Sequence, residues 1–172
     1  MINMYIRELR TEDESHFLHV MQKSKSFHAP FVIAPQTPAE FQAYLQKSKQ
    51  DNQKCFLALD DVECIIGVFN ISDIVRGVFQ SAYLGLYASV DFAGQGAMSQ
   101  ALKLVLKDIF LKLKLHRIEA NIQPTNTASI RLVQNNGFIR EGFSQRYLKC
   151  NGIWCDHFRF AITYEDWLAN QA

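Results

Sequence analysis

The sequence predicts a single α/β domain, residues 1–172, with a mixed and largely antiparallel central sheet that is flanked by helices. The chain has 172 residues, of which 48% are apolar and 20% charged, so one domain with a sizeable core is expected. Its middle contains short β-rich runs separated by a turn, and such hairpins join antiparallel strands. A glycine turn then leads into an amphipathic helix, and further strand and helix patterns follow it.

Two capping boxes predict helices in the first third of the chain. In the first box, Thr11 can accept a hydrogen bond from the amide three residues on, and Glu14 can reach back. In the second, Thr37 and Glu40 take these roles, and Pro38 occupies the first helical position, where its missing N–H costs nothing. Apolar residues then recur on one face of each helix: Phe17, Val20 and Met21 in the first, and Phe41, Tyr44 and Leu45 in the second.

The rest of the chain is expected to form strands and two further helices. The Gly94-Gln95-Gly96 turn precedes a helix whose apolar residues run from Leu102 to Leu113. A short helix opens near Thr125, and Gly137 suits the left-handed residue that follows its end. Strands are expected at residues 55–59 and 62–70, which form a hairpin, and at residues 78–88, 117–122, 138–141, 145–149 and 157–163.

Charge and apolar patterning exclude several classes of protein. The 18 Lys and Arg and 17 Asp and Glu give a net charge of +1, which argues against a strong non-specific nucleic-acid binder or a polybasic membrane anchor. No apolar run approaches the roughly 18 residues that span a bilayer, and residues 1–10 contain no apolar segment of signal-peptide type.

The four cysteines predict structural thiols rather than a metal site, a nucleophile or disulfides. Cys150 and Cys155 are five residues apart, with no histidine at zinc-finger spacing. Cys55 and Cys64 lie inside apolar runs, where cysteine is usually a small buried hydrophobe. We therefore expect a reduced, cytoplasmic protein that binds no metal.

The segment from Leu86 to Met98 is the clearest candidate for a ligand-binding site in the sequence. It is expected to form a strand, a tight turn and a helix start, and the first amides of a helix point out of its end without partners inside it. The helix dipole adds positive potential there, so a diphosphate is a natural ligand. Gly94 and Gly96 let the backbone approach phosphate oxygens without a side-chain clash.

Three interpretations of this turn are open from the residues alone: a strand-to-helix turn without a ligand, a dinucleotide-binding turn, and a loop for the diphosphate of coenzyme A. For the dinucleotide motif, Glu119 lies near the expected position of the ribose-binding acid, but Ser99 replaces the third glycine. The turn also lies in the middle of the chain, after hairpins, rather than in a first βαβ unit.

The sequence around this turn resembles the GNAT N-acetyltransferases. Residues 93–98, Ala-Gly-Gln-Gly-Ala-Met, are similar to the coenzyme A loop of that family. The pattern Asn126-x-x-Ser129-x-x-Leu132, followed by Gly137-Phe138, is similar to its second signature. The resemblance is greatest to one branch, the bacterial ribosomal-protein alanine N-acetyltransferases, over residues 70–79, 116–121, 141–142, 147–148 and 152–157.

This resemblance implies a GNAT-like fold that binds acetyl-CoA and uses no metal. It implies that the backbone of Leu86 and Ala88 contacts the pantetheine arm. The residues that it places at the diphosphate are Gly94, Gln95, Gly96, Ala97 and Met98. The residues that it places at the cofactor through their side chains are Asn121, Asn126 and Ser129, with Arg131 as a weaker candidate for the 3′-phosphate.

The groups that transfer protons are less clearly marked. Many GNAT enzymes carry a tyrosine near the position of Val133 that protonates the leaving thiolate, and this chain has none there, so no general acid follows from the resemblance. Tyr87 and Ser89, on or beside the central strand, and Glu141, on a late strand, are the candidates for catalytic proton transfer. The alternative for these residues is packing or a structural ion pair.

Five further residues bear on the acceptor and its proton. Asp156 and His157 are neighbours, so on a strand at most one of them faces a cleft. Phe31, Arg76 and Tyr147 are candidates for binding the acceptor, with core packing or solvent exposure as the alternative.

We expect an acetyl-CoA-dependent N-acetyltransferase that modifies the N-terminal alanine of a ribosomal protein. An α-amino group has a pKa of about 7.7–8.0, so it is partly neutral at pH 7 and makes little demand for a base. The alternatives are the same reaction on a small-molecule amine and a non-catalytic sensor that binds acyl-CoA. The expected partners are acetyl-CoA and a protein N-terminus or small amine, with no direct nucleic acid or membrane contact, and a monomer or homodimer is expected.

Overall fold

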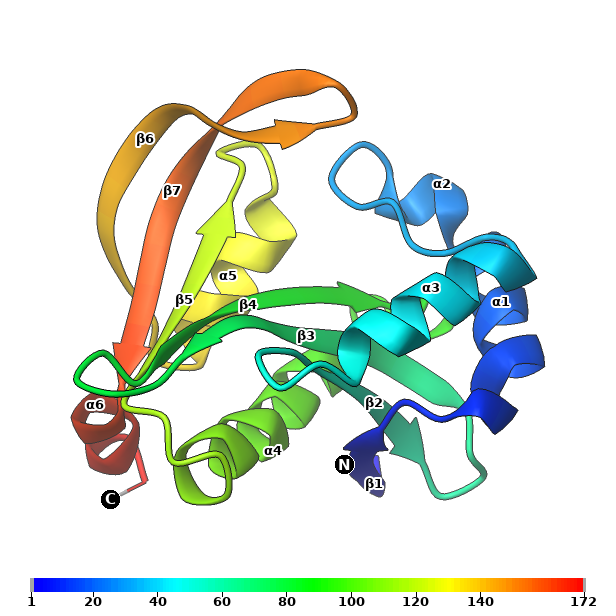
Figure 1. Ribbon diagram of the computed structural model, residues 1–172, viewed down its shortest axis with the longest axis horizontal. Coiled ribbons are helices and arrows are strands. Elements are labelled where there is room, and N and C mark those ends of the chain that lie inside the picture. Colours follow the sequence, from blue (N-terminus) through cyan, green and yellow to red (C-terminus); the bar gives the residue numbers. More distant parts are fainter. Residues whose placement is uncertain (1, 172) are drawn as a thin grey trace.

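The computed structural model describes residues 2–171 and contains one seven-stranded sheet in the order β1-β2-β3-β4-β5-β7-β6 (Figure 1). The fold class predicted from the sequence is confirmed. The strands are β1 (Met4–Glu8), β2 (Lys54–Asp60), β3 (Ile65–Val75), β4 (Ser81–Ala88), β5 (Arg117–Ile122), β6 (Ile139–Cys150) and β7 (Ile153–Thr163). The helices are α1 (Glu14–Lys23), α2 (Lys25–His28), α3 (Pro38–Ser48), α4 (Ala97–Leu111), α5 (Thr127–Asn135) and α6 (Tyr164–Ala169), with 3-10 turns at Thr11–Asp13 and Val90–Phe92.

The pairing of β4 with β5 is the feature of the sheet that matters most for a site. Every other pair of neighbouring strands is antiparallel, whereas β4 and β5 run parallel. They pair only between residues 81–83 and 117–119, and beyond these positions the two strands diverge (Figure 1). The last five residues of β4 therefore lack a strand partner on that side, and their backbone is free to bind something else.

Helices cover both faces of the sheet and create two cores. The core on the side of α4, α5 and α6 contains Phe69, Leu102 and Trp167. The core on the side of α1 and α3 contains Phe17 and Val68. The neighbours Val68 and Phe69 enter opposite cores because successive side chains of a strand alternate between its faces.

The two predicted capping boxes had different outcomes. The box at Thr37 is confirmed: its hydroxyl accepts from the Glu40 amide at 3.3 Å, and the Glu40 carboxylate reaches back to the Thr37 amide. The box at Thr11 was wrong by one residue, because Asp13 accepts from the Arg10 amide at 2.7 Å. Burial alone raises the pKa of Asp13, but the guanidinium of Arg7 and that amide hold it below its ordinary value.

Other elements also differ from the prediction. β1 and α6 were missed, and the three late strands predicted from residue 138 onward are two long strands, β6 and β7. Register shifts at residues 140–142 and 144–148 break the alternation of β6, so the sequence pattern reads as separate pieces. Cys64 was expected to be buried and is exposed, whereas burial raises the pKa of the Cys55 thiol to about 12. Within residues 2–171 no helix combines the length and the apolar composition needed to cross a membrane.

Candidate active site

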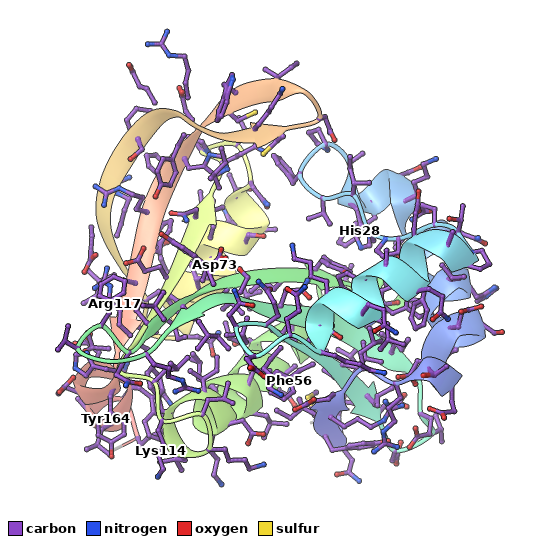
Figure 2. All side chains as sticks on the ribbon, in the orientation of Figure 1. His28, Phe56, Asp73, Lys114, Arg117 and Tyr164 are labelled. Atoms are coloured by element: carbon purple, nitrogen blue, oxygen red, sulfur yellow. The ribbon has the colours of Figure 1, made fainter. Side chains whose placement is uncertain are left out.

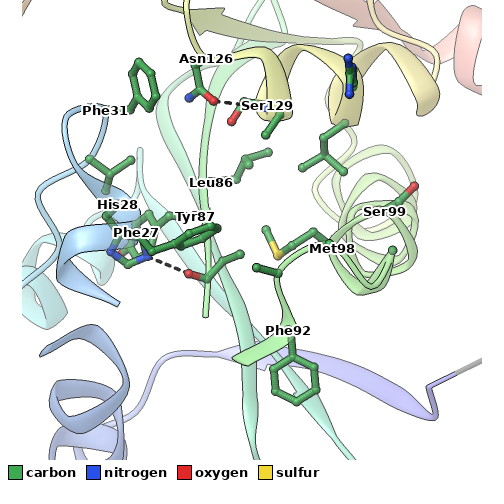
Figure 3. A pocket seen from close by; sticks show the side chains of 18 of the residues that line it. Phe27, His28, Phe31, Leu86, Tyr87, Phe92, Met98, Ser99, Asn126 and Ser129 are labelled. Atoms are coloured by element: carbon green, nitrogen blue, oxygen red, sulfur yellow. Dashed lines mark hydrogen bonds between the residues drawn. The ribbon is translucent and has the colours of Figure 1, made fainter. Parts of the chain in front are cut away.

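A cavity of about 540 Å³ opens where β4 and β5 diverge. We call it the main cavity, and Figure 3 shows the side chains around it. Its walls come from the end of α2 and the segment after it, the end of β4, the glycine turn, the first residues of α4, and α5. Phe31, Leu86 and Met98 supply apolar wall, and Asn126 and Ser129 supply polar wall on the α5 side. The local divergence of two strands therefore brings together segments about 100 residues apart in the sequence.

The glycine turn presents unpaired backbone amides at the edge of this cavity. Gly94 and Gly96 have positive φ angles of 73° and 74°, and Gly96 is the N-cap of α4 without a side-chain cap. Within residues 2–171, the amides of residues 94–98 have no hydrogen-bond acceptor. The side chain of Gln95 donates to the Asp91 carbonyl at 2.7 Å and so braces the turn. Five consecutive free amides at the positive end of a 15-residue helix form a site suited to an anion.

Three predicted polar residues surround the opening between the strands. The side-chain oxygen Oδ1 of Asn126 caps α5 by accepting from the Ser129 backbone amide at 3.3 Å, which leaves the side-chain nitrogen Nδ2 of Asn126 free (Figure 3). Asn121 lines a smaller cavity of about 220 Å³ between β4 and β5, which we call the strand-gap cavity. Its Oδ1 atom is buried and has no hydrogen-bond partner within the described chain. A buried polar atom without a partner costs free energy, so this atom is suited to meet a ligand.

A third cavity lies on the α3 side of the sheet. This opposite-face cavity has a volume of about 570 Å³ and is lined by the segment after α2, by α3 and by β4. Phe31, Val32 and Leu86 line all three cavities. Two ligands that enter from the two faces can therefore meet beside these three side chains.

Tyr87 and Ser89 lie beside the cavities, but their polar groups have structural partners. The Tyr87 hydroxyl lies 2.9 Å from that of Tyr44, and burial raises the pKa of both. Ser89 is 1% exposed, and its hydroxyl accepts from the Asp91 amide at 3.3 Å. A further neighbour is His28, which sequence reasoning did not single out within its loop; its Nε2 lies 2.7 Å from the Ala88 carbonyl oxygen (Figure 3).

Three other predicted residues are not brought to the main cavity. Glu141 forms an ion pair with Arg117 at the paired end of β5, and hydrogen bonding to Arg117 lowers the pKa of Glu141. Figure 2 shows Arg117 far from His28, across the sheet. Arg76 is exposed in the turn before β4 and donates to the Leu113 carbonyl. Tyr147 lines none of the three cavities, although its ring packs against His157 with centroids 6.3 Å apart.

Within residues 2–171, no group of three or more His, Cys, Asp and Glu side chains is placed to hold a metal ion. The polar groups that line the main cavity are backbone amides, hydroxyls, side-chain amides, one imidazole and the guanidinium of Arg131. This set suits an anionic and extended ligand with an apolar portion.

Comparison with known proteins agrees with this geometry. The family described as "Acetyltransferase (GNAT) domain" matches residues 3–139. The probable N-acetyltransferase YjcK of Bacillus subtilis is 32% identical over 174 residues, which cover 95% of each chain. The ribosomal protein uS5 alanine N-acetyltransferase of Escherichia coli is 39% identical over 107 residues, which cover 62% of this chain and 55% of that protein.

Solved structures show the same fold. Mycobacterium smegmatis RimJ in complex with CoA-disulfide superposes with a TM-score of 0.87 at 25% identity, over 95% of this chain and 83% of that one. Spermidine N-acetyltransferase from Vibrio cholerae, in complex with CoA and spermine, has a TM-score of 0.82 at 20% identity, over 96% and 98%. The matched family, which spans most of the chain, and the full-length relative agree with the strand divergence and the free amides: the chain belongs to the GNAT acetyltransferase family.

Proposed function

We propose that this protein transfers an acetyl group from acetyl-CoA to the N-terminal alanine of a ribosomal protein. The observation that carries the proposal is the run of free amides at residues 94–98, which opens onto the cavity between β4 and β5. A diphosphate bound there by backbone amides leaves the rest of the carrier to extend along β4 toward Leu86. The complex of M. smegmatis RimJ with CoA-disulfide supports this choice of ligand.

In this proposal the donor is held mostly by backbone. The amides of residues 94–98 bind the diphosphate, and the free edge of β4 at Leu86 and Ala88 binds the pantetheine arm. The carbonyl oxygen of Ala88 already accepts a hydrogen bond from His28, so Ala88 would bind the pantetheine arm through the second lone pair of that oxygen or through its backbone amide. Asn121, Asn126 and Ser129 contact the donor from the other side of the opening, and Arg131, which lines the main cavity, binds the 3′-phosphate.

The acceptor enters through the opposite-face cavity. Apolar side chains dominate its lining, including Phe31, Val32 and Leu86, and such walls suit a short side chain such as that of alanine. Placement of the amine beside the thioester can by itself supply several kcal/mol of the barrier. The 39% identical segment of the E. coli ribosomal protein uS5 alanine N-acetyltransferase supports this acceptor.

The charge of that cavity argues against a polyamine acceptor. Within the described chain its only carboxylate is Glu40, which accepts from the Gln36 amide at 2.6 Å and the Thr37 amide at 3.3 Å. A polyamine carries several ammonium groups, and these need carboxylates that are not already engaged. A neutral or singly charged acceptor fits this lining better.

The experiment is a panel of acceptors with acetyl-CoA, read by mass spectrometry. Peptides that begin with alanine, the same peptides with a blocked N-terminus, and spermidine are compared. We expect acetylation of the free alanine peptides alone. Acetylation of spermidine in preference to peptides would favour the small-amine alternative, and binding of acetyl-CoA by calorimetry without transfer to any amine would favour a sensor.

A further inference from the structure

The strand-gap cavity contains a histidine that the site described so far does not use. His157 lies on β7, is 3% exposed, and lines this cavity together with Leu86, Asn121 and Asn126. Phe158 and Phe160 belong to the α4-side core, so the alternation of β7 directs His157 toward the opposite, α3 side of the sheet. That is the face from which the acceptor amine enters in the proposed function.

Hydrogen bonding fixes which nitrogen of this imidazole carries the proton. Nδ1 of His157 lies 2.9 Å from the Cys155 carbonyl oxygen. A carbonyl oxygen can only accept, so Nδ1 is the donor, and in the neutral ring Nε2 keeps its lone pair. Within residues 2–171, the side-chain hydrogen bond of His157 involves Nδ1 alone, so Nε2 is free. The Tyr147 ring packs edge-on against the imidazole at 6.3 Å and helps to fix its orientation.

The other groups around the three cavities are poorly placed to accept a proton. Glu40 is engaged by two backbone amides. His28 donates from Nε2 to the Ala88 carbonyl and so also keeps a lone pair, on Nδ1, but that atom is buried and has no hydrogen-bond partner through which a proton could leave. Burial raises the pKa values of Tyr44, Tyr87 and Cys150, so these groups stay protonated near neutral pH. His157 combines a lone pair, a fixed tautomer and a cavity shared with Leu86.

We propose that Nε2 of His157 is the general base that accepts a proton from the acceptor amine, an inference that rests on the proposed function. The amine nitrogen forms a bond to the thioester carbonyl carbon, and its proton passes to Nε2 directly or through one water. The carbon–sulfur bond then breaks, its electron pair leaves with sulfur, and the thiolate takes up a proton from solvent. The imidazolium returns its proton to solvent, so the products are the acetylated amine and the free thiol.

The surroundings of His157 are largely uncharged. Tyr147 and Cys150 face it from β6, and Gln123 and Asn121 line the cavity from the β5 side. Arg159, two residues on, is a cation on the same face of β7. Asp156 points to the other face of the hairpin, where it accepts from the Arg146 amide at 2.8 Å, and serves as a matched control.

The test compares His157→Asn with Asp156→Asn in the full chain, on whichever acceptor the wild type acetylates. Asn at position 157 keeps a donor for the Cys155 carbonyl but has no basic nitrogen. We expect kcat to fall by about 100-fold to 1,000-fold, with the rate limb at low pH abolished and the affinity for acetyl-CoA by calorimetry unchanged. Asp156→Asn should stay within about 2-fold of wild type.

His157→Ala with added imidazole provides an independent readout. Recovery of turnover by imidazole, at constant affinity for acetyl-CoA, supports a base at this position, since a structural role is not restored by a free base. Near wild-type kcat with an unchanged pH profile in His157→Asn would overturn the inference while leaving the proposed function intact. If His157→Asn loses binding of acetyl-CoA, the absence of imidazole rescue in His157→Ala would overturn it. A wild type that binds acetyl-CoA but acetylates no amine would instead refute the proposed function.

Discussion

The two ends of β4 differ in whether their polar groups have hydrogen-bond partners within the protein. At the paired end, β4 bonds to β5, and the polar side chains there bond to one another: Arg117 donates to Glu119 at 2.8 Å and to Glu141. At the open end the strands diverge, and Asn121 Oδ1 and the amides of residues 94–98 have no partner within the described chain. The polar groups at the paired end therefore need no ligand as a partner, whereas those at the open end are free to bind one.

This difference separates polar groups that stabilise the fold from groups kept for binding. A buried polar atom without a partner costs about 1–3 kcal/mol, so a stable chain keeps few of them. Of the four such side-chain atoms within residues 2–171, His28 Nδ1 and Asn121 Oδ1 belong to residues that line the cavities at the open end of β4, which indicates where a ligand can supply a partner. The same reasoning moves Glu141, predicted from the sequence as a proton-transfer candidate, to the structural end.

The largest expected effect follows from Gly96→Ala at the open end. A Cβ at Gly96 meets no atom within 4 Å, but its φ of 74° strains any residue other than glycine. If the turn relaxes, two charge-assisted hydrogen bonds are lost, and affinity for acetyl-CoA should fall by about 100-fold in calorimetry. Gly77→Ala is the matched control, because Gly77 has a φ of 71° and equally empty surroundings but lies in the β3–β4 turn at the other end. If Gly96→Ala and Gly77→Ala bind acetyl-CoA with equal affinity, the open end of β4 is no more important for binding than the paired end.

Arg117→Ala tests the paired end. It leaves the half-buried Glu119 without its partner, and we expect a loss of about 1–2 kcal/mol in the free energy of unfolding, with binding of acetyl-CoA unchanged. Arg117 lowers the pKa of Glu141 in the folded protein, so this stabilisation is present above the ordinary carboxyl pKa and is lost as pH falls through the folded value. The difference between variant and wild type should therefore shrink below about pH 4 in urea titrations. If Arg117→Ala weakens the affinity for acetyl-CoA, the paired end also contributes to binding, and the proposed difference between the two ends of β4 is wrong.

Asn121→Ala should separate stability from binding. Removal of an unsatisfied buried oxygen leaves the free protein as stable as wild type or up to about 1 kcal/mol more stable. The same change should weaken acetyl-CoA binding by about 10-fold, the loss of one hydrogen bond. Thermal melts with and without acetyl-CoA measure both quantities. A destabilised free protein would show that Asn121 has a structural partner instead.

Glu141→Gln should have the smallest effect. The Glu141 side chain is 42% exposed, so solvent screens its ion pair, and a loss of no more than about 0.5 kcal/mol in stability is expected. Turnover should equal that of wild type, because Glu141 lines none of the three cavities. A large fall in kcat with unchanged stability would restore Glu141 as a catalytic candidate.

The sequence predicted the elements whose signals are local. The capping box at Thr37, the stripe of α4 and the glycine turn at residues 94–96 each depend on a few neighbouring residues, and each was found. β1 was missed because it is a five-residue edge strand without clean alternation that pairs with residues about 50 positions away. Its position depends on tertiary pairing rather than on its own pattern.

The site was predictable to a similar degree. The turn and Asn126 belong to short motifs, and the structure places both at the main cavity. His28 and Ala88, which form a hydrogen bond, are 60 residues apart in the sequence, and no local pattern in either segment predicts this contact. The sequence could show that at most one of Asp156 and His157 faces the cleft, but the choice between them needed the pairing of β7 with β5 and β6.

The walls of the opposite-face cavity have a consequence for evolution. They come largely from the segment after α2, where Ile33 is 77% exposed, and a single contact from Asn151 to the Pro30 carbonyl, at 3.2 Å, ties the β6–β7 hairpin tip to this segment. Replacements in such exposed loops change folding free energy little. If the proposed function is correct, a lineage with this scaffold can exchange one acceptor amine for another by substitutions in these two segments, while the main-chain amides that would bind the diphosphate are kept.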